Sequence, residues 1–223
     1  MALSHSPSIV TEGLILCLDA ANLKSYPGTG TNWSNLTGST SGTLINGVGF
    51  SSSNGGLLTF DGTNDYVNVP GLFDFSTTNQ LTVSIWCKSN TALWDDVGQL
   101  VSKRDQFIIH PSLNSKDVIY YVRVSTPAWA QQTVVPNSIT VFNNYAMTYN
   151  SGDFRIFLNG SQSGQQSVVS TLNSDTGDTT IGKDDGLERY LNGDVSNVFI
   201  YNRALSPQEI LQNFNALRGR FGL

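Results

Sequence analysis

The stretch that decides the fold of this chain is residues 179–220, TTIGKDDGLERYLNGDVSNVFIYNRALSPQEILQNFNALRGR. Within it, residues 193–201 alternate between two sets of side chains, one of which is Val195, Asn197, Phe199 and Tyr201. Alternation with a period of two is the pattern of a β-strand, because successive side chains point to opposite faces of a sheet. The stretch therefore predicts a strand close to the C-terminal end.

A helix is predicted directly after this strand, over residues 207–217. Ser206 can cap it by accepting a hydrogen bond from the backbone of Glu209, and Pro207 suits the first helical position. Glu209 completes the capping box. Apolar side chains then recur at helical spacing, at Ile210, Leu211, Phe214 and Leu217. We expect this face of the helix to pack on the sheet.

The rest of the chain contains many short alternating segments separated by turns. In residues 81–88, Leu81, Val83, Ile85 and Cys87 share one face, and Trp86 lies on the other. Leu57–Phe60 and Asp65–Val69 flank a turn and predict a hairpin. Further strands are expected near residues 13–19, 43–45, 100–103, 106–110, 118–124, 133–135, 144–149, 153–158, 167–170 and 179–181. This pattern predicts an all-β fold, a two-sheet antiparallel jelly-roll sandwich with a short C-terminal helix.

Length and charge limit the classes of protein to which the chain can belong. A chain of 223 residues suits one large sandwich domain. The net charge is −5 and the 12 Lys and Arg residues are scattered, so no basic stripe is present to neutralise a nucleic-acid backbone. We expect a single domain over residues 13–223, preceded by an N-terminal arm over residues 1–12.

The apolar segments indicate neither a membrane span nor a leader. No run of 18 apolar residues occurs, so membrane insertion is not expected. The N-terminus lacks the positive region and cleavage site of a secretory signal, so if this is the whole gene product we expect it to fold in a cytoplasm. Cys17 and Cys87 lie in separate strand-like runs and are expected to be reduced, buried thiols.

Three blocks of sequence resemble the laminin G-like, concanavalin A-like jelly-roll family. The first, over residues 181–210, keeps the pattern I-G-K…R…L-N-G-D-V…V…I-Y-N-R-A-L-S…E-I; the others are LTFDGTNDYV at 58–67 and IFLNG at 156–160. Together they place nearly the whole chain in one such domain. The resemblance implies the same two-sheet fold.

The resemblance also implies a calcium site, since laminin G-like domains often hold Ca²⁺ at one rim of the sandwich. Loop carboxylates are the ligands that this cation prefers. The candidate ligands are Asp61, Asp65, Asp184 and Asp185, with Asn64 as a neutral helper. The alternative is that the Asp61-Gly62 and Asn64-Asp65 pairs serve only the geometry of a tight turn. No other cofactor is expected.

Aromatic residues in loops are candidates for contact with a glycan, because a flat ring packs on the face of a sugar. Those in or beside loop-like stretches are Tyr26, Trp33, Trp94, Trp129 and Tyr190. The alternative is that they are ordinary core or interface residues.

Catalysis is not expected. Glycoside hydrolases on related scaffolds place two glutamates close together on one strand, because an acid and a nucleophile must flank one glycosidic bond. The chain has three glutamates, none adjacent to another in sequence, namely Glu12, Glu188 and Glu209. Its two histidines, His5 and His110, indicate neither a zinc site nor a Ser-His-Asp arrangement.

Two further stretches resemble the version of this domain found in structural proteins of tailed bacteriophages: LDAAN…SYPGTGTNW over residues 18–33 and ALRGRFGL at 216–223. The resemblance implies a non-catalytic virion protein, a capsid decoration, tail or fibre component made in the host cytoplasm, which contacts host surface glycan. Its partners would be other virion proteins and copies of itself, contacted through apolar residues near the termini, Leu3, Ile9, Val10 and Phe221. The alternative is a secreted carbohydrate-binding module that uses calcium.

Overall fold

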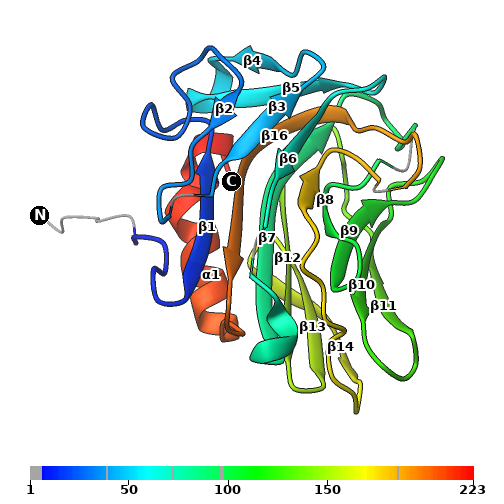
Figure 1. Cartoon of the computed structure of the whole chain (residues 1–223). Coiled ribbons are helices and arrows are strands. Elements are labelled where there is room, and N and C mark those ends of the chain that lie inside the picture. Colours follow the sequence, from blue (N-terminus) through cyan, green and yellow to red (C-terminus); the bar gives the residue numbers. More distant parts are fainter. Residues whose placement is uncertain (1–6, 39, 72, 96–97, 185) are drawn as a thin grey trace, which may run out of the picture.

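The computed structural model describes residues 7–38, 40–71, 73–95, 98–184 and 186–223 (Figure 1). Its strands are β1 (Leu14–Asp19), β2 (Asn32–Trp33), β3 (Gly42–Ile45), β4 (Gly49–Ser51), β5 (Leu57–Asp61), β6 (Tyr66–Val69), β7 (Gln80–Ser89), β8 (Val101–Lys103), β9 (Phe107–Pro111), β10 (Val118–Arg123), β11 (Trp129–Val134), β12 (Asn143–Asn150), β13 (Asp153–Leu158), β14 (Ser161–Ser167), β15 (Thr179–Ile181) and β16 (Asn192–Tyr201). The helical segments are α1 (Pro207–Leu217) and three 3-10 turns, η1 (Ser53–Gly55), η2 (Phe75–Thr77) and η3 (Arg218–Phe221).

The strands of the described residues form two eight-stranded antiparallel sheets that face each other (Figure 1). Sheet A has the order β14-β13-β12-β7-β16-β5-β4, and β1 also pairs with β16. Sheet B has the order β11-β10-β9-β8-β15-β6-β3-β2. The jelly-roll sandwich with one short C-terminal helix that the sequence predicted is confirmed.

The main core fills the space between the two sheets. On β7 the predicted inward face is confirmed, because Leu81, Val83, Ile85 and Cys87 are all buried in this core. Trp86, between them, points to the outer face of sheet A. Both cysteines are free and buried, as expected, with Cys17 on the outer side of sheet A and Cys87 in the main core.

Helix α1 covers the outer face of sheet A, on the side away from sheet B (Figure 1). The indole ring of Trp86 stacks on Phe214 with centroids 5.4 Å apart and on Phe221 with centroids 4.4 Å apart. Ile210 and Leu217 pack into the same cluster. Leu211 was predicted to share this face but is 44% exposed.

Two sequence predictions about strands fail because they depend on distant pairing. Leu57–Phe60 and Asp65–Val69 are not a hairpin, since β5 pairs with β16 in sheet A and β6 pairs with β15 in sheet B. The turn between them crosses from one sheet to the other. In β16, a register shift between Val195 and Asn197 interrupts the alternation, so Val195 faces the main core together with Val198.

Edge strands were the hardest to predict. β14 is SQSGQQS, with no apolar side chain to create a period, and it replaces the strand expected at residues 167–170. Pairing with β13 holds it in place. β11 begins at Trp129, ahead of the strand expected at 133–135, and the short strands β2 and β4 were not predicted.

Both ends of the described chain pack on the domain itself. The backbone N–H of Val10 donates to Oδ1 of Asn213 at 2.8 Å, and the Tyr201 hydroxyl donates to the Val10 carbonyl at 2.9 Å. Ile9, Val10 and Phe221 pack against the cluster under α1 but are only partly buried, which agrees with the expectation that a lone monomer leaves them partly exposed. Their contact with neighbouring subunits stays a prediction. Leu3 lies outside the described residues.

The outer face of sheet B lies opposite the helix-covered side of the molecule (Figure 1). No helix among the described residues is long and apolar enough to cross a membrane.

Candidate functional site

The outer face of sheet B carries a cleft of about 360 Å³. Strands β9, β10 and β11 form one part of it, and the rest comes from the segments beside β8 and the loop between β15 and β16. The residues that line it are Gln99, Arg104, Ile108, His110, Tyr121, Trp129, Gln131, Asp184, Leu187 and Arg189.

Strand alternation places these side chains on the outside of the sheet. On β10, Tyr120 and Val122 are buried in the main core, so Tyr121 between them faces outward. On β9, Phe107 and Ile109 are buried there, which turns Ile108 and His110 outward. The same apolar period that builds the core therefore sets the floor of the cleft.

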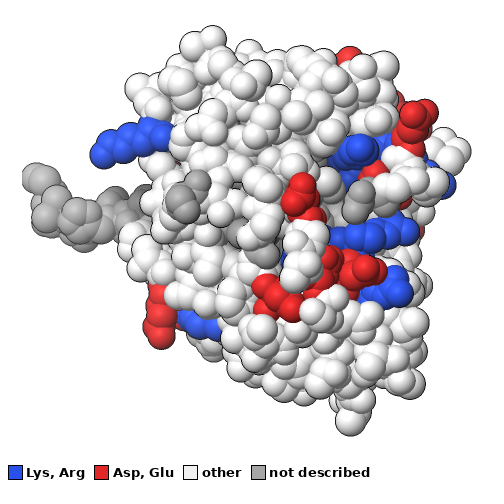
Figure 2. Space-filling view, in the orientation of Figure 1, with Lys and Arg blue, Asp and Glu red and all other residues white. Residues whose placement is uncertain are grey.

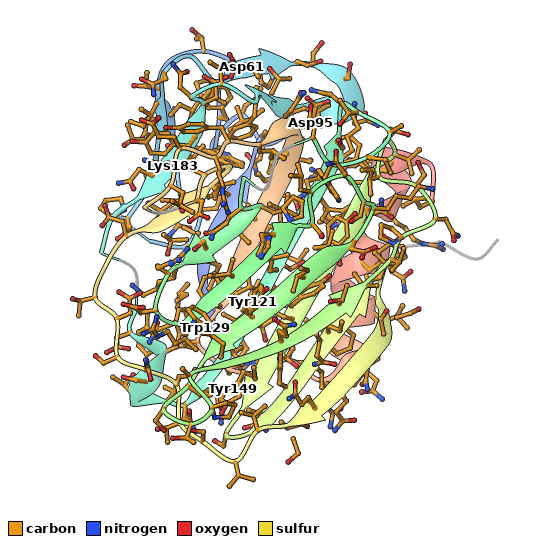
Figure 3. All side chains as sticks on the ribbon, turned by 90° about the vertical axis from the view of Figure 1, so that its right-hand side faces the viewer. Asp61, Asp95, Tyr121, Trp129, Tyr149 and Lys183 are labelled. Carbon is orange, nitrogen blue, oxygen red and sulfur yellow. The ribbon has the colours of Figure 1, made fainter. Side chains whose placement is uncertain are left out.

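A row of rings crosses this floor. The His110 and Tyr121 rings stack with centroids 5.2 Å apart and planes 3° apart. Tyr121 meets Trp129 edge to face at 5.9 Å, and the two lie side by side on the face of sheet B that is turned to the viewer in Figure 3. The Arg123 guanidinium lies 4.9 Å from the centre of the Trp129 ring. These contacts hold Trp129 in a defined orientation while part of its side chain stays exposed.

A group of charged side chains borders the rings. Nη1 of Arg104 donates to Oδ1 of Asp184 at 2.8 Å, and Nη1 of Arg189 lies 3.8 Å from Oδ2 of Asp184. The Asp184 side chain is 6% exposed, whereas those of Arg104 and Arg189 are 41% and 47% exposed. Charged residues gather on this side of the molecule, to the right in Figure 2, while much of the remaining face is uncharged.

His110 is neutral at neutral pH, because burial lowers the pKa of its imidazole below 6.5. Its Nδ1 lies within hydrogen-bond distance of the Pro111 carbonyl, which can only accept. Nδ1 therefore carries the proton, and Nε2 is an acceptor. The imidazole adds a ring face and an acceptor to the cleft without adding charge.

The structure separates the five aromatic residues that were candidates for sugar contact. Trp129 lines the cleft, and Tyr190 follows Arg189 in the loop beside it and is half-buried. Tyr26, Trp33 and Trp94 are 3%, 0% and 1% exposed and belong to the main core. Rings at these buried positions are not accessible to a sugar, so the sugar contact predicted for these three residues does not fit the structure. The prediction relied on loop-like sequence around each ring, and such sequence does not prevent a ring from packing inward.

Of the ten described residues that line the cleft, sequence reasoning proposed only Trp129 and Asp184 as site residues. The other eight were missed, among them Tyr121, Gln131 and Arg189. The signal for Tyr121 was present, since alternation with Tyr120 and Val122 turns it outward. No sequence signal joins Arg104 to Asp184, because they are 80 positions apart.

The three calcium candidates that the structure describes, Asp61, Asp65 and Asp184, do not form one metal site. Asp65 is buried and its Oδ2 accepts from the Asp61 backbone at 3.3 Å, while Oδ1 of Asp61 accepts from the Thr63 backbone at 2.8 Å. Burial, and then the charge of Asp61, raises the pKa of Asp65. Asp184 lies in the cleft with two arginines, and Asp185 is outside the described residues. In the described part of the chain, no three His, Cys, Asp or Glu residues gather as metal ligands would.

Glu209, one of the glutamates considered for catalysis, is engaged in structure. Arg203 donates to both of its oxygens, at 2.7 and 3.0 Å, and the Ser206 backbone donates to Oε2 at 2.8 Å. The hydrogen bond from Arg203 is the main reason that the pKa of Glu209 falls to about 2. A carboxyl group with this pKa is a poor general acid at neutral pH.

Among the solved structures with the same fold are binding domains of a mosquitocidal protein and of botulinum neurotoxins. The binding domain of Paraclostridial Mosquitocidal Protein 1 superposes with a TM-score of 0.74 at 15% identity, over 92% of this chain and 52% of that one. The binding domain of botulinum neurotoxin DC, in complex with SialylT, has a TM-score of 0.74 at 13% identity, over 93% and 52%. The binding domain of botulinum neurotoxin serotype D has a TM-score of 0.71 at 11% identity, over 91% and 51%. The chain thus spans about half the length of these domains, and the likeness is one of fold.

No curated protein matches the chain by sequence. The sequence model of one family, described as the concanavalin A-like lectin/glucanases superfamily, matches residues 61–211, which is more than half of the chain. The matched segment runs from the last residue of β5 into helix α1 and includes every strand that lines the cleft. The chain therefore belongs to the laminin G-like family of the concanavalin A-like lectin/glucanases superfamily.

Proposed function

We propose that this protein is a non-catalytic carbohydrate-binding module whose ligand lies in the cleft on sheet B. The observation that carries the proposal is that one cleft combines the outward rings of Tyr121 and Trp129 with hydrogen-bonding side chains, among them Gln131 and Arg189. A ring packs on the apolar face of a sugar, while amide and guanidinium groups form hydrogen bonds with its hydroxyls.

The geometry of the cleft supports a small, oriented ligand. Its volume of about 360 Å³ is at the lower end of small-ligand sites, which run from roughly 300 to 1,000 Å³. Trp129 is held by Tyr121 and Arg123, and Asp184 is held by Arg104. Groups that are already ordered lose little conformational entropy when a ligand binds, which favours affinity.

The structural neighbours agree with a glycan ligand. One neighbour is described in complex with SialylT, and another in a study of neurotoxin type C whose cell entry depends on two ganglioside molecules. Each neighbour is about twice as long as the matched part, so these ligands belong to the whole binding domains. They support a glycan as the class of ligand, and only the cleft indicates where on this chain a glycan would bind.

A glycan array followed by calorimetry tests the proposal. Trp129→Ala is expected to weaken binding of the best saccharide at least about fivefold, because stacking on a ring contributes roughly a kcal/mol or more. Phe50→Ala is the matched control, since Phe50 is 36% exposed on β4 of sheet A, and its affinity should stay within about twofold. Failure of every saccharide to bind, or full binding by Trp129→Ala, would overturn the proposal.

We propose further that the module works on the outside of a tailed-bacteriophage particle, as a capsid decoration, tail or fibre component beside other virion proteins. The support is the resemblance of residues 18–33 and 216–223 to phage structural proteins. The second candidate, a secreted calcium-dependent module, is favoured by the family membership alone. Mass spectrometry of purified particles separates the two, because a virion component must be present at a fixed copy number. Absence from particles, with glycan binding that EDTA abolishes, would favour the secreted module.

A further inference from the structure

We propose that the cleft on sheet B selects an acidic saccharide and that Arg104 and Arg189 bind its carboxylate. This inference rests on the proposed carbohydrate-binding function and adds the chemical class of the ligand.

The first observation is the charge of the cleft. Among its described lining residues, two guanidinium groups accompany one carboxylate, that of Asp184, and His110 is neutral. These described lining residues together carry a net positive charge, although the whole chain carries a net charge of −5. This excess of positive charge attracts an anionic sugar electrostatically, whereas a neutral sugar gains no binding energy from it.

The second observation is the depth at which each charge lies. Asp184 is 6% exposed, and the two arginine side chains are 41% and 47% exposed. A ligand that enters from solvent therefore meets the guanidinium groups before it meets the carboxylate. Asp184 acts as a positioning residue, because its oxygens hold the arginines from beneath rather than facing the ligand.

The third observation is the number of donors that the arginines retain. A guanidinium has five N–H donors. Arg104 gives one hydrogen bond to Asp184, and Arg189 lies 3.8 Å from the same carboxylate, beyond hydrogen-bond range. Each planar guanidinium can still pair with both oxygens of a planar carboxylate, which is the strongest arrangement for this pair of groups.

The rings complete the arrangement. Arginines and rings line the same cleft, so a pyranose over Trp129 can extend a ring carboxylate toward Arg104 or Arg189. Stacking is expected to supply affinity for saccharides in general, and the arginines to supply selectivity for charge.

The experiment uses pairs of saccharides that differ only in charge. An array carries sialylated and uronic-acid oligosaccharides, the methyl esters of the same compounds, and sulfated counterparts, and the best pair is measured by calorimetry at low and high salt. The acid is expected to bind about tenfold more tightly than its ester, because one charge-assisted hydrogen bond changes affinity by about this factor. The difference in affinity should shrink as the salt concentration rises, because salt screens the attraction between the charges.

Variants locate the effect. Arg189→Gln is expected to reduce the preference for the acid to about twofold and to leave affinity for the ester nearly unchanged. Arg218→Gln, at an exposed arginine on η3, is the control and should keep the full preference. Thermal unfolding of each variant verifies that it is folded.

The outcomes separate this inference from the proposed function. Equal binding of acid and ester, both weakened by Trp129→Ala, would leave a carbohydrate-binding cleft and overturn its selectivity for acids. Tighter binding of sulfated than of carboxylated saccharides would overturn the carboxylate assignment. Binding of no saccharide at all would overturn both.

Discussion

The guanidinium of Arg220 makes two parallel hydrogen bonds to the carboxylate of Asp19, Nη1 to Oδ1 at 2.8 Å and Nη2 to Oδ2 at 2.7 Å. These residues are 201 positions apart, and the pair ties η3 to the end of β1. Both side chains are largely shielded from solvent, at 29% and 10% exposure. Paired, planar contacts of this kind are stronger than single surface ion pairs.

Arg220→Gln should therefore lower the free energy of unfolding by about 2 kcal/mol, the usual size for a hydrogen-bonded charge that loses its partner. Urea unfolding measures the change. Arg218→Gln is the matched control, because Arg218 is exposed two residues earlier and should change stability by less than about 0.5 kcal/mol. Equal midpoints for the two variants would mean that the pair contributes nothing to stability.

Ser206→Ala should cost about 1 kcal/mol, because the Ser206 hydroxyl accepts from the Glu209 backbone at 3.3 Å and caps α1. Ser206→Thr keeps a hydroxyl acceptor and should lose much less. The measurement is the midpoint of urea unfolding, compared between variants whose unfolding free energy depends on urea concentration with the same slope. A variant with alanine that unfolds like the wild type would show that packing on Trp86 alone holds the helix.

Acid should destabilise the fold through Asp74 and Glu209. Burial acts to raise the pKa of Asp74, but hydrogen bonds from Ser174, Ser76 and Asp175 outweigh it and lower the pKa to about 2, from an ordinary 3.8. The pKa of Glu209 is likewise about 2, from 4.5. A depressed pKa gives stability that is present above the ordinary value and is lost as pH falls toward the folded-state value.

The melting temperature should therefore fall between about pH 4.5 and pH 2. Asp74→Asn should have a lower melting temperature than the wild type at neutral pH, but its melting temperature should fall less on acidification. Asp65 acts in the opposite sense, because its pKa is raised and its contribution is lost as pH rises. If the melting temperature of Asp74→Asn falls with pH as steeply as that of the wild type, Asp74 is not a source of the acid sensitivity.

Calcium should leave the melting temperature unchanged. Asp61 and Asp65 already accept backbone hydrogen bonds in their turn, and Asp184 is engaged with Arg104. The measurement compares EDTA with millimolar calcium for the wild type and for Asp65→Asn. A rise of several degrees with calcium that Asp65→Asn abolishes would restore the predicted metal site at the turn.

The sequence alone determined the elements that depend on neighbours in the chain. The cap of α1 needs only Ser206, Pro207 and Glu209, and it forms as predicted because its hydrogen bonds span three residues. The inward face of β7 follows from the period of its apolar side chains. The family resemblance followed from local blocks of sequence for the same reason.

Tertiary structure decided the rest, because it depends on contacts between distant residues. Trp33 and Trp129 have similar loop-like surroundings in sequence, yet packing between the sheets buries the first and leaves the second in the cleft. The bulge in β16 turns Val195 toward the core through its pairing with β7. Arg104 reaches Asp184 only because sheet B brings β8 beside β15. The energy of such contacts depends on which strands become neighbours, and no local pattern specifies that.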